Sequence, residues 1–297
     1  MHNEAPATHR NWTILGILNW TTAYFSSHDV EAPRASAEII LAHVLRVNRI
    51  DLYTNYDKPL TGDELAAYKR LIKRRVGREP VAYITGTKGF WSMDLHVTDK
   101  CLIPRPETEI LVQEALAFLP EDSIGPPMKI LEFGTGSGAV VIALALERPG
   151  HLFFASDCFT EALWVARKNA TEHHLMDQIL FFAGDWTEPL KIESRFDMII
   201  SNPPYIPTSE ITHLQLEISR FEPAAALDGG MDGLSCIRRI VGSVRNHLAP
   251  GGRLLLEIGY DQKTKVADII RSVGGYEDIA FVRDYGGHYR VVSAKKN

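Results

Sequence analysis

The sequence predicts an α/β protein whose larger part is a doubly wound parallel sheet, preceded by a small helical domain. Three observations support this prediction. From Met128 onward, short apolar segments alternate with helical patterns, which is typical of a parallel sheet covered by helices. A glycine-rich turn at residues 134–138 separates the first of these strands from its helix. Residues from about 11 to 85 show helical periodicity instead.

The length, composition and net charge of the chain limit the class of protein. A chain of 297 residues fits one large domain or two ordinary ones. Its hydrophobic fraction of 45% is normal for a globular protein with a full-sized core. The formal net charge of −5 argues against a dedicated nucleic-acid binder, because such proteins usually carry a basic face. We therefore expect no direct binding to nucleic acid.

Cysteine and histidine usage favours neither disulfides nor a metal. Cys101, Cys158 and Cys236 are far apart and odd in number, so they form neither a disulfide framework nor a zinc pattern. A reducing, cytoplasmic compartment is the simplest expectation. The polar residues 1–10 lack the apolar core of a signal peptide, and no stretch approaches the roughly 18 apolar residues of a membrane span. The eleven histidines are scattered, and we expect no metal site.

The N-terminal region predicts three main helices. Pro33 opens the second, and Thr61 with Glu64 forms a capping box that opens the third. We interpret the basic residues of the third helix as a solvated face, with a docking surface for an acidic or RNA-bearing partner as the alternative. These basic residues are Lys69, Arg70, Lys73, Arg74, Arg75 and Arg78.

A β-hairpin is expected to join this region to the rest of the chain. Residues 86–105 contain Gly89 followed by two aromatic residues and then alternating apolar positions. A helix with Pro106 and acidic residues in its first turn follows. The expected domains are therefore a helical domain (1–85), a hairpin linker (86–105) and a catalytic α/β domain (106–297).

The α/β domain is expected to contain alternating strands and helices. We predict strands at 129–133, 152–156, 179–183, 196–201 and 253–258, and two late strands near 278–282 and 289–293. The predicted helices cover 139–146, 160–172 and 234–248. In such sheets ligands bind just beyond the carboxyl ends of the strands, so the residues that follow each strand are the candidate site.

The first strand is followed by Gly134-Thr135-Gly136-Ser137-Gly138, a turn that aims backbone N–H groups at a ligand. Gly134, Gly136 and Ala139 also fit the dinucleotide pattern, so an NAD-dependent dehydrogenase is one alternative. Asp157 ends the next strand and can accept both ribose hydroxyls of an adenosine, or else cap the following helix. Together these residues predict a nucleotide-type cofactor.

Asp185 and Trp186 follow the third strand. The acid can accept a hydrogen bond from an adenine amino group and the indole can cover the ring, although the indole could also belong to the core. Both are expected to contact the cofactor.

The tetrapeptide Asn202-Pro203-Pro204-Tyr205 follows the fourth strand. Two prolines stiffen the backbone, and Asn202 is held extended because it precedes a proline. The Asn202 side-chain oxygen and the Pro203 carbonyl can then accept both hydrogens of one –NH2 group, while Tyr205 offers a flat face. A simple tight turn is the alternative. We expect a site that makes a planar nitrogen nucleophilic, which suits methyl transfer better than hydride transfer.

In this order, the glycine-rich turn, Asp157, Asp185-Trp186 and Asn202-Pro203-Pro204-Tyr205 resemble class I S-adenosylmethionine-dependent methyltransferases that modify planar amino groups. The flanking motifs narrow the resemblance to the release factor glutamine methyltransferases of the HemK/PrmC type. Those motifs are Tyr83-Ile84-Thr85-Gly86, the stretch from Leu102 to Glu109, Glu222-Pro223-Ala224 and Asp232-Gly233-Leu234.

This resemblance implies a seven-stranded sheet, S-adenosyl-L-methionine as cofactor, and peptide chain release factors as protein substrates. The reaction implied is methylation of the side-chain amide nitrogen (N5) of the glutamine in their Gly-Gly-Gln motif. It also implies that the helical domain holds the substrate, that residues 134–138, Asp157, Trp186 and Asn202 contact the cofactor, and that residues 202–205 contact the glutamine.

Two residues depart from the family pattern: Glu132 stands where Asp is usual, and Phe159 where a small Ser is usual. The Asn-Pro-Pro-Tyr motif is shared with adenine-N6 DNA and RNA methyltransferases, which are the alternative reading.

Overall fold

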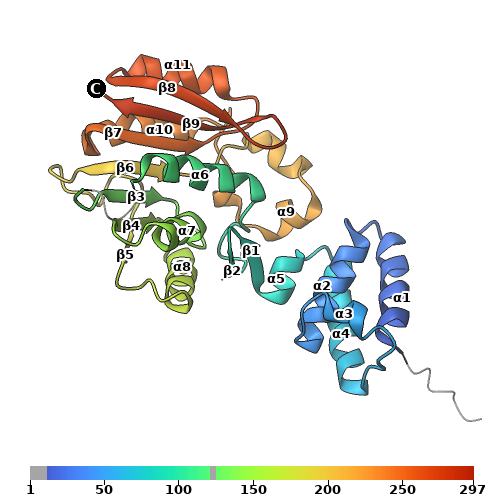
Figure 1. Cartoon of the computed structure of the whole chain (residues 1–297). Coiled ribbons are helices and arrows are strands. Elements are labelled where there is room, and N and C mark those ends of the chain that lie inside the picture. Colours follow the sequence, from blue (N-terminus) through green and yellow to red (C-terminus); the bar gives the residue numbers. More distant parts are fainter. Residues whose placement is uncertain (1–11, 121–124) are drawn as a thin grey trace, which may run out of the picture. The chain divides into compact units, whose positions relative to one another are not determined.

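The computed structural model describes residues 12–120 and 125–297 and divides the chain into two compact units between Thr85 and Gly86 (Figure 1). The hairpin expected as a linker belongs to the second unit. In the described part of the chain, no helix is long and apolar enough to cross a membrane.

The first unit is helical. Its elements are α1 (Ile14–Ser26), α2 (Pro33–Leu45), α3 (Asp51–Thr54), α4 (Gly62–Val76) and α5 (Val81–Thr85). The expected capping box is present: the Thr61 side chain accepts from the Glu64 backbone N–H, and the Glu64 carboxylate accepts from the Thr61 N–H. The apolar faces of the helices enclose one core that includes Phe25, Leu41 and Tyr68.

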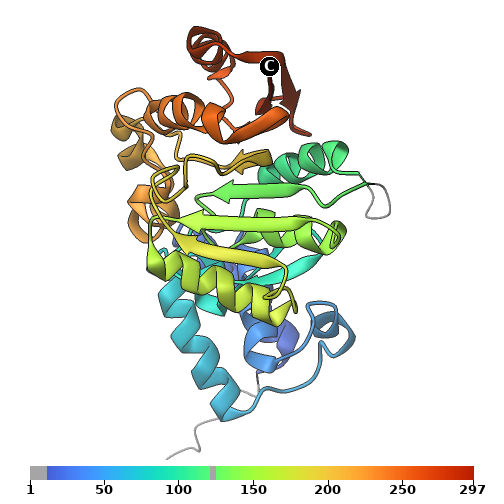
Figure 2. The ribbon, with the colours of Figure 1, turned by 90° about the vertical axis from the view of Figure 1, so that its left-hand side faces the viewer.

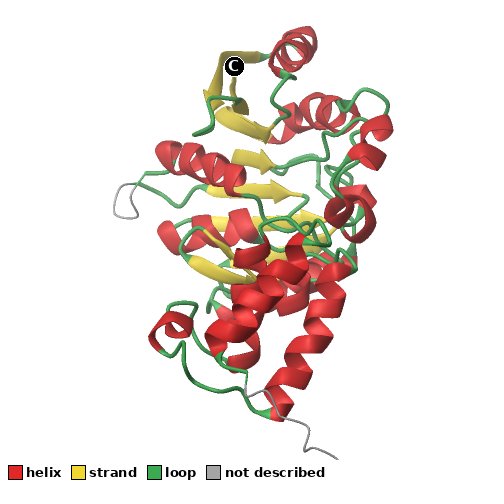
Figure 3. Cartoon of the chain, turned by 90° about the vertical axis from the view of Figure 1, so that its right-hand side faces the viewer, coloured by secondary structure: helices red, strands yellow, loops and turns green. Residues whose placement is uncertain are grey.

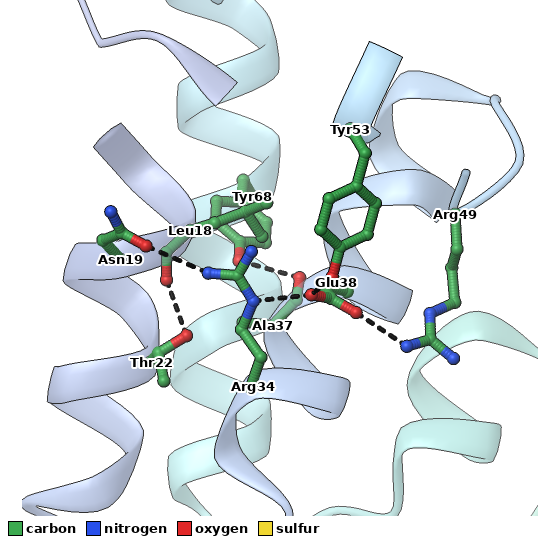
Figure 4. Close-up of polar contacts among 9 residues, drawn as sticks. All are labelled: Leu18, Asn19, Thr22, Arg34, Ala37, Glu38, Arg49, Tyr53 and Tyr68. Carbon is green, nitrogen blue, oxygen red and sulfur yellow. Dashed lines mark hydrogen bonds and ion pairs between the residues drawn. The ribbon is translucent and has the colours of Figure 1, made fainter. Parts of the chain in front are cut away.

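A buried carboxylate lies within this helical unit (Figure 4). Glu38 is only 1% exposed, and it accepts hydrogen bonds from Arg34 Nε (2.5 Å), Arg49 Nη2 (2.6 Å) and the Tyr53 hydroxyl. Burial opposes its ionisation, but the hydrogen bonds from Tyr53, Arg49 and Arg34 outweigh that effect and lower its pKa to about 2. Glu38 is therefore a fully compensated ion that ties α2 to its neighbours.

The interpretation of the third predicted helix as carrying only solvated basic residues is wrong for Arg75. This side chain is 4% exposed and donates to the backbone carbonyl of Glu79, 3.3 Å away. Arg74 pairs with the Glu79 carboxylate. The long apolar stem of an arginine can be buried when its guanidinium group finds oxygen partners, and the loop after α4 supplies them here.

The second unit begins with a hairpin of β1 (Thr87–Phe90) and β2 (Met93–His96), followed by the 3-10 turn η1 (Pro106–Thr108) and by α6 (Glu109–Phe118). Its sheet has seven strands in the order β5-β4-β3-β6-β7-β9-β8, which confirms the expected fold. All neighbouring strands are parallel except β9, which is antiparallel to both β7 and β8. The strands are β3 (Lys129–Phe133), β4 (Leu152–Asp157), β5 (Ile179–Ala183), β6 (Phe196–Ser201), β7 (Leu248–Glu257), β8 (Tyr276–Arg283) and β9 (Tyr289–Lys296).

Helices cover both faces of this sheet (Figures 2 and 3). The apolar residues of α6 and α7 (Ala139–Glu147) share one core with the hairpin. Those of α10 (Ser235–Val244) and α11 (Lys263–Val273) form the core on the opposite face. The remaining helices are α8 (Thr160–Glu172), α9 (Leu216–Phe221) and the 3-10 turns η2 (Thr208–His213), η3 (Ala224–Ala226) and η4 (Arg245–His247).

The predicted bounds of the elements agree closely with the structure in the middle of the sheet and less well elsewhere. The predicted ranges of β3, β5, β6 and α8 match the structure residue for residue. The hairpin is shorter than predicted, because a turn in which the Cys101 N–H donates to the Thr98 carbonyl ends the extended backbone. The predicted helix 234–248 stops at Val244, and β7 already begins at Leu248, since its first residue pairs with Phe196 across a bulge.

Candidate active site

The carboxyl ends of three adjacent strands lie at one edge of the sheet. Phe133 at the end of β3 pairs with Ser156 of β4 on one side and with Ser201 of β6 on the other. A pocket of about 500 Å³ opens beyond this edge. Most of the residues singled out from the sequence line it: Gly134, Thr135, Gly136, Ser137, Asp157, Asp185, Trp186, Asn202 and Pro204.

The glycine-rich turn leaves open space beside the pocket. Gly134 and Gly136 have φ angles of 64° and 56°, and a Cβ at either position would meet no atom within 4 Å. Gly138 lies outside the pocket lining. It precedes α7 with φ of 83°, and a Cβ there would meet Ile142 and Ala166 at 2.9 and 3.2 Å. Two glycines thus leave room for a ligand, whereas Gly138 serves the close approach of two helices.

Asp157 is buried and already holds the two loops beside it. Its Oδ2 accepts from the Gly136 N–H at 2.9 Å, and its Oδ1 accepts from the Phe159 N–H at 3.0 Å. Burial raises its pKa, and the backbone hydrogen bonds oppose that rise. Asp157 does not cap α8, because Phe159 is the N-cap residue and no side chain caps this helix. The carboxylate lines the pocket, and each of its oxygens keeps a second acceptor site.

Glu132, one of the two departures from the family pattern, lines the pocket and also hydrogen-bonds within the protein. Its Oε2 accepts from Thr135 Oγ1 at 2.6 Å and from the Val141 N–H at 3.2 Å. Burial raises its pKa to about 8, although the hydrogen bonds from Thr135 and Val141 oppose that rise. Phe159, the other departure, is 47% exposed and lies at the pocket wall.

Asp185 and Trp186 lie at the pocket with partners of their own. The Asp185 carboxylate pairs with Arg239 of α10 at 2.7 Å. The Trp186 indole meets the Phe133 ring edge-on, with the ring centroids 6.0 Å apart. The indole is thus held from behind while it lines the pocket.

Asn202 lies between this pocket and a second, smaller one of about 100 Å³. The second pocket is also lined by Pro203 and Tyr205, together with apolar residues that include Ile218. The Asn202 Nδ2 group donates to Thr108 Oγ1 at 3.2 Å, which leaves its Oδ1 as an acceptor. The tetrapeptide therefore contributes residues to both pockets.

Arg105 also borders both pockets. It forms an ion pair with the buried carboxylate of Glu222, whose Oε2 accepts from the Ile103 N–H at 3.1 Å. Two of the motifs quoted from the sequence, around residues 102–109 and 222–227, are thereby joined in space.

Sequence reasoning missed a group of residues next to the tetrapeptide. The Tyr205 hydroxyl donates to Glu257 Oε1 at 3.1 Å, and Glu257 is the buried last residue of β7. A charged residue directly after three leucines at a strand end was the available signal. Tyr205 accordingly has a polar anchor in addition to the flat face expected of it.

Comparisons with known proteins agree with this geometry. A model of the PrmC N-terminal domain matches residues 16–86, and a model of the methyltransferase small domain matches residues 108–222. Release factor glutamine methyltransferase of Geobacter sulfurreducens is 40% identical over 96% of this chain and 97% of its own length. That of Caulobacter vibrioides is 38% identical over 96% and 98%, and that of Salmonella typhimurium is 40% identical over 90% and 94%.

Among solved structures, a methyltransferase from Pyrococcus furiosus matches 75% of this chain and 96% of its own, with 20% identity and a TM-score of 0.51, which supports the fold alone. The fold, the pocket at the strand ends and relatives that match nearly end to end lead to one conclusion. This chain belongs to the release factor glutamine methyltransferase family of class I S-adenosylmethionine-dependent methyltransferases.

Proposed function

We propose that this protein transfers the methyl group of S-adenosyl-L-methionine to the side-chain amide nitrogen (N5) of the glutamine in the Gly-Gly-Gln motif of peptide chain release factors. One observation supports this most directly: Asn202 borders both a large pocket and a small one. A substrate side chain in the small pocket would therefore lie next to Asn202, at the border of the proposed cofactor pocket.

The large pocket suits S-adenosyl-L-methionine. Open space beside Gly134 and Gly136 allows a ligand to approach the backbone closely. The buried Asp157 carboxylate can accept ribose hydroxyls, and Asp185 and Trp186 can flank the adenine. Residues 134–137 and Asn202 complete the proposed cofactor contacts. When bound, the cofactor supplies a methyl group already activated on a sulfonium centre, so the proposal needs no metal.

The tetrapeptide would orient the nitrogen that receives the methyl group. An amide nitrogen is a poor nucleophile because its lone pair is delocalised. The Asn202 Oδ1 and the Pro203 carbonyl would accept the two amide hydrogens, while Pro204 and Tyr205 complete the wall. These fixed dipoles align the nitrogen and stabilise the positive charge that develops on it, and the proton leaves after transfer.

The helical unit would hold the release factor. It presents exposed aromatic side chains, namely Trp20 on α1, Tyr53 in α3 and Tyr56 just after α3. Trp20 stacks on Tyr24 with their centroids 5.0 Å apart. Such surfaces are enriched at protein interfaces. A substrate of the translation machinery also implies a cytoplasmic reaction without a membrane partner.

The experiment is a methyl-transfer assay with labelled S-adenosylmethionine and a purified release factor. A release factor whose Gly-Gly-Gln glutamine is changed to alanine is the matched control. We expect label on the unaltered factor alone. Label on bare DNA or RNA, with none on the release factor, would replace this proposal by the adenine-N6 alternative.

A further inference from the structure

The loop formed by residues 184–190 follows β5 and carries Asp185 and Trp186, which are proposed to flank the adenine. It folds back tightly on itself, since a Cβ on Gly184 would overlap with the ring of Pro189. Trp186 has a φ angle of 52°, in the left-handed region that residues other than glycine rarely adopt. A conformation of this kind persists only when its surroundings hold it in place.

Apolar packing holds one side of this loop. Trp186 and Leu190 pack against the core to which α10 contributes its apolar residues, and the Trp186 ring also meets Phe133 edge-on. Cys236 of α10 lines the same pocket as Trp186. The loop and the first turn of α10 therefore border the pocket together.

Arg239 of α10 holds the polar side of the loop. Its Nη1 lies 2.7 Å from Asp185 Oδ2, and its Nη2 donates to Glu188 Oε1 at 2.7 Å. A guanidinium group presents several N–H donors in one rigid plane, so it can bind two carboxylates at once. One cation thus ties two points of the loop to the helix.

The same ion pair orients the Asp185 carboxylate, which lines the pocket. Oδ2 is held by Arg239, whereas Oδ1 forms no hydrogen bond within residues 12–120 and 125–297 and remains an acceptor. A carboxylate accepts hydrogen bonds and donates none. Held in this way, Asp185 fits the amino group of an adenine and repels an oxo group at the same ring position.

We propose that Arg239 is a positioning residue that determines cofactor specificity. By holding Asp185 and Glu188, it fixes the loop so that Trp186 covers the adenine and Asp185 Oδ1 accepts from the adenine amino group. The inference rests on the cofactor contacts of the proposed function. It goes beyond them, because it assigns a role to a residue that is not among those lining the pocket.

The first experiment measures cofactor binding to Arg239→Met and Arg239→Lys in the full chain by isothermal titration. Methionine keeps much of the apolar stem and removes the guanidinium group. We expect the Kd of S-adenosyl-L-methionine to rise roughly 3- to 10-fold, because two partly exposed ion pairs are lost. At saturating cofactor, kcat should stay within about twofold of the wild type, as for a residue that contributes to binding alone. Lysine should restore only part of the affinity, because an ammonium group lacks the planar fork.

Arg238→Met is the matched control. Arg238 is the neighbouring residue of α10, and its partner Asp232 is not among the residues that line the pocket. This variant removes the same charge from the same helix, and its cofactor Kd should stay within about twofold of the wild type, because an exposed ion pair away from the pocket contributes little. An equal rise in Kd in Arg238→Met and Arg239→Met would show that net charge determines the affinity, and it would overturn the inference. Wild-type affinity in Arg239→Met would overturn it too.

The second experiment compares S-adenosylhomocysteine with S-inosylhomocysteine, in which an oxo group replaces the amino group of the purine. The wild type should bind the adenine compound roughly tenfold or more tightly, because the oxo group leaves the Asp185 carboxylate without a donor. Arg239→Met should lose most of this preference. An effect on folding alone would weaken both ligands equally, so an unchanged ratio of the two Kd values would overturn the inference.

Glu188→Ala makes the same comparison if Arg239→Met does not fold, because it releases one of the two ties at an exposed position. A lower ratio of the two Kd values than in the wild type supports the inference, and an unchanged ratio overturns it. All these measurements depend on cofactor binding and not on the release factor. If the wild type shows the expected preference but leaves the release factor unlabelled, the proposed function fails and the role of Arg239 stands.

Discussion

Glu38 of the helical unit and the glutamates Glu132 and Glu257 of the catalytic unit are all buried, but their surroundings shift their pKa values in opposite directions. In the helical unit, Glu38 is surrounded by two arginines and a tyrosine, and its pKa is lowered to about 2. In the catalytic unit, burial raises the pKa of Glu132 to about 8 and that of Glu257 to about 7. A buried carboxylate that is paired with cations stays ionised and holds its neighbouring helices in one arrangement. A buried acid without such partners, next to a pocket, can change its protonation state during function.

This contrast predicts that substitutions in the catalytic unit alter turnover and those around Glu38 alter stability. The largest effect is expected for Asn202→Ala, which removes the proposed acceptor for the substrate amide. Loss of one such fixed dipole typically lowers kcat about 10²- to 10³-fold. Cofactor affinity and the free energy of unfolding should change little. Isothermal titration measures the cofactor affinity, and single-turnover methylation of the release factor measures the loss of rate.

Asp157→Ala is the matched contrast for Asn202→Ala. It should weaken cofactor binding, because Asp157 both lines the pocket and holds the Gly136 N–H at 2.9 Å. Near-normal turnover in Asn202→Ala would contradict the role given to the tetrapeptide, and unchanged cofactor affinity in Asp157→Ala would contradict the ribose role.

The sequence was most informative where local patterns decide the structure. The strands β3, β5 and β6 are mostly apolar runs with a glycine or a polar residue directly after them, so both their bounds and the candidate pocket residues could be predicted. Helix α11 and the turns around α9 had no prediction, although the buried residues Val266, Ala267 and Ile270 of α11 have helical spacing.

Partners that are distant in the sequence explain what was missed at the site. The bond between Asn202 and Thr108 joins residues 94 positions apart, and that between Tyr205 and Glu257 joins residues 52 apart. No spacing rule predicts such pairs. Gly138 belongs to the motif but is not among the residues that line the pocket, and a Cβ there would meet Ile142 and Ala166.

The next largest effect is expected in the helical unit. Glu38→Gln removes the charge that Arg34 and Arg49 share, and loss of hydrogen bonds to a charged group should lower the free energy of unfolding by about 2 kcal/mol. Glu79→Gln is the matched control, because its pair with Arg74 is more exposed and should cost less than about 1 kcal/mol. Hydrogen exchange of α1 and α2 amides in the full chain measures both. An equal decrease in the free energy of unfolding in the two variants would show that Glu38 stabilises the helical unit no more than an exposed ion pair does.

The last effect is a difference in how the two units respond to pH. Because the folded-state pKa of Glu38 is lowered from 4.5 to about 2, its stabilisation is present above about pH 4.5 and is lost as the pH falls toward 2. Because those of Glu132 and Glu257 are raised, the folded catalytic unit binds more protons than the unfolded chain between 4.5 and 7 to 8. Its stability should therefore fall as the pH rises through that range, by at most about 1.4 kcal/mol per pH unit for each group.

Hydrogen exchange of each unit at pH 5 and pH 8, corrected for the intrinsic rate, tests this difference. The β3 and β7 amides should lose protection at pH 8 relative to pH 5, while the α2 amides should not. Glu132→Gln keeps an acceptor for Thr135 and Val141 without the titration, so it should flatten the pH dependence of β3. If β3 shows the same pH dependence in the variant and the wild type, Glu132 already has a compensated charge, and the contrast with Glu38 would then rest on Glu257 alone.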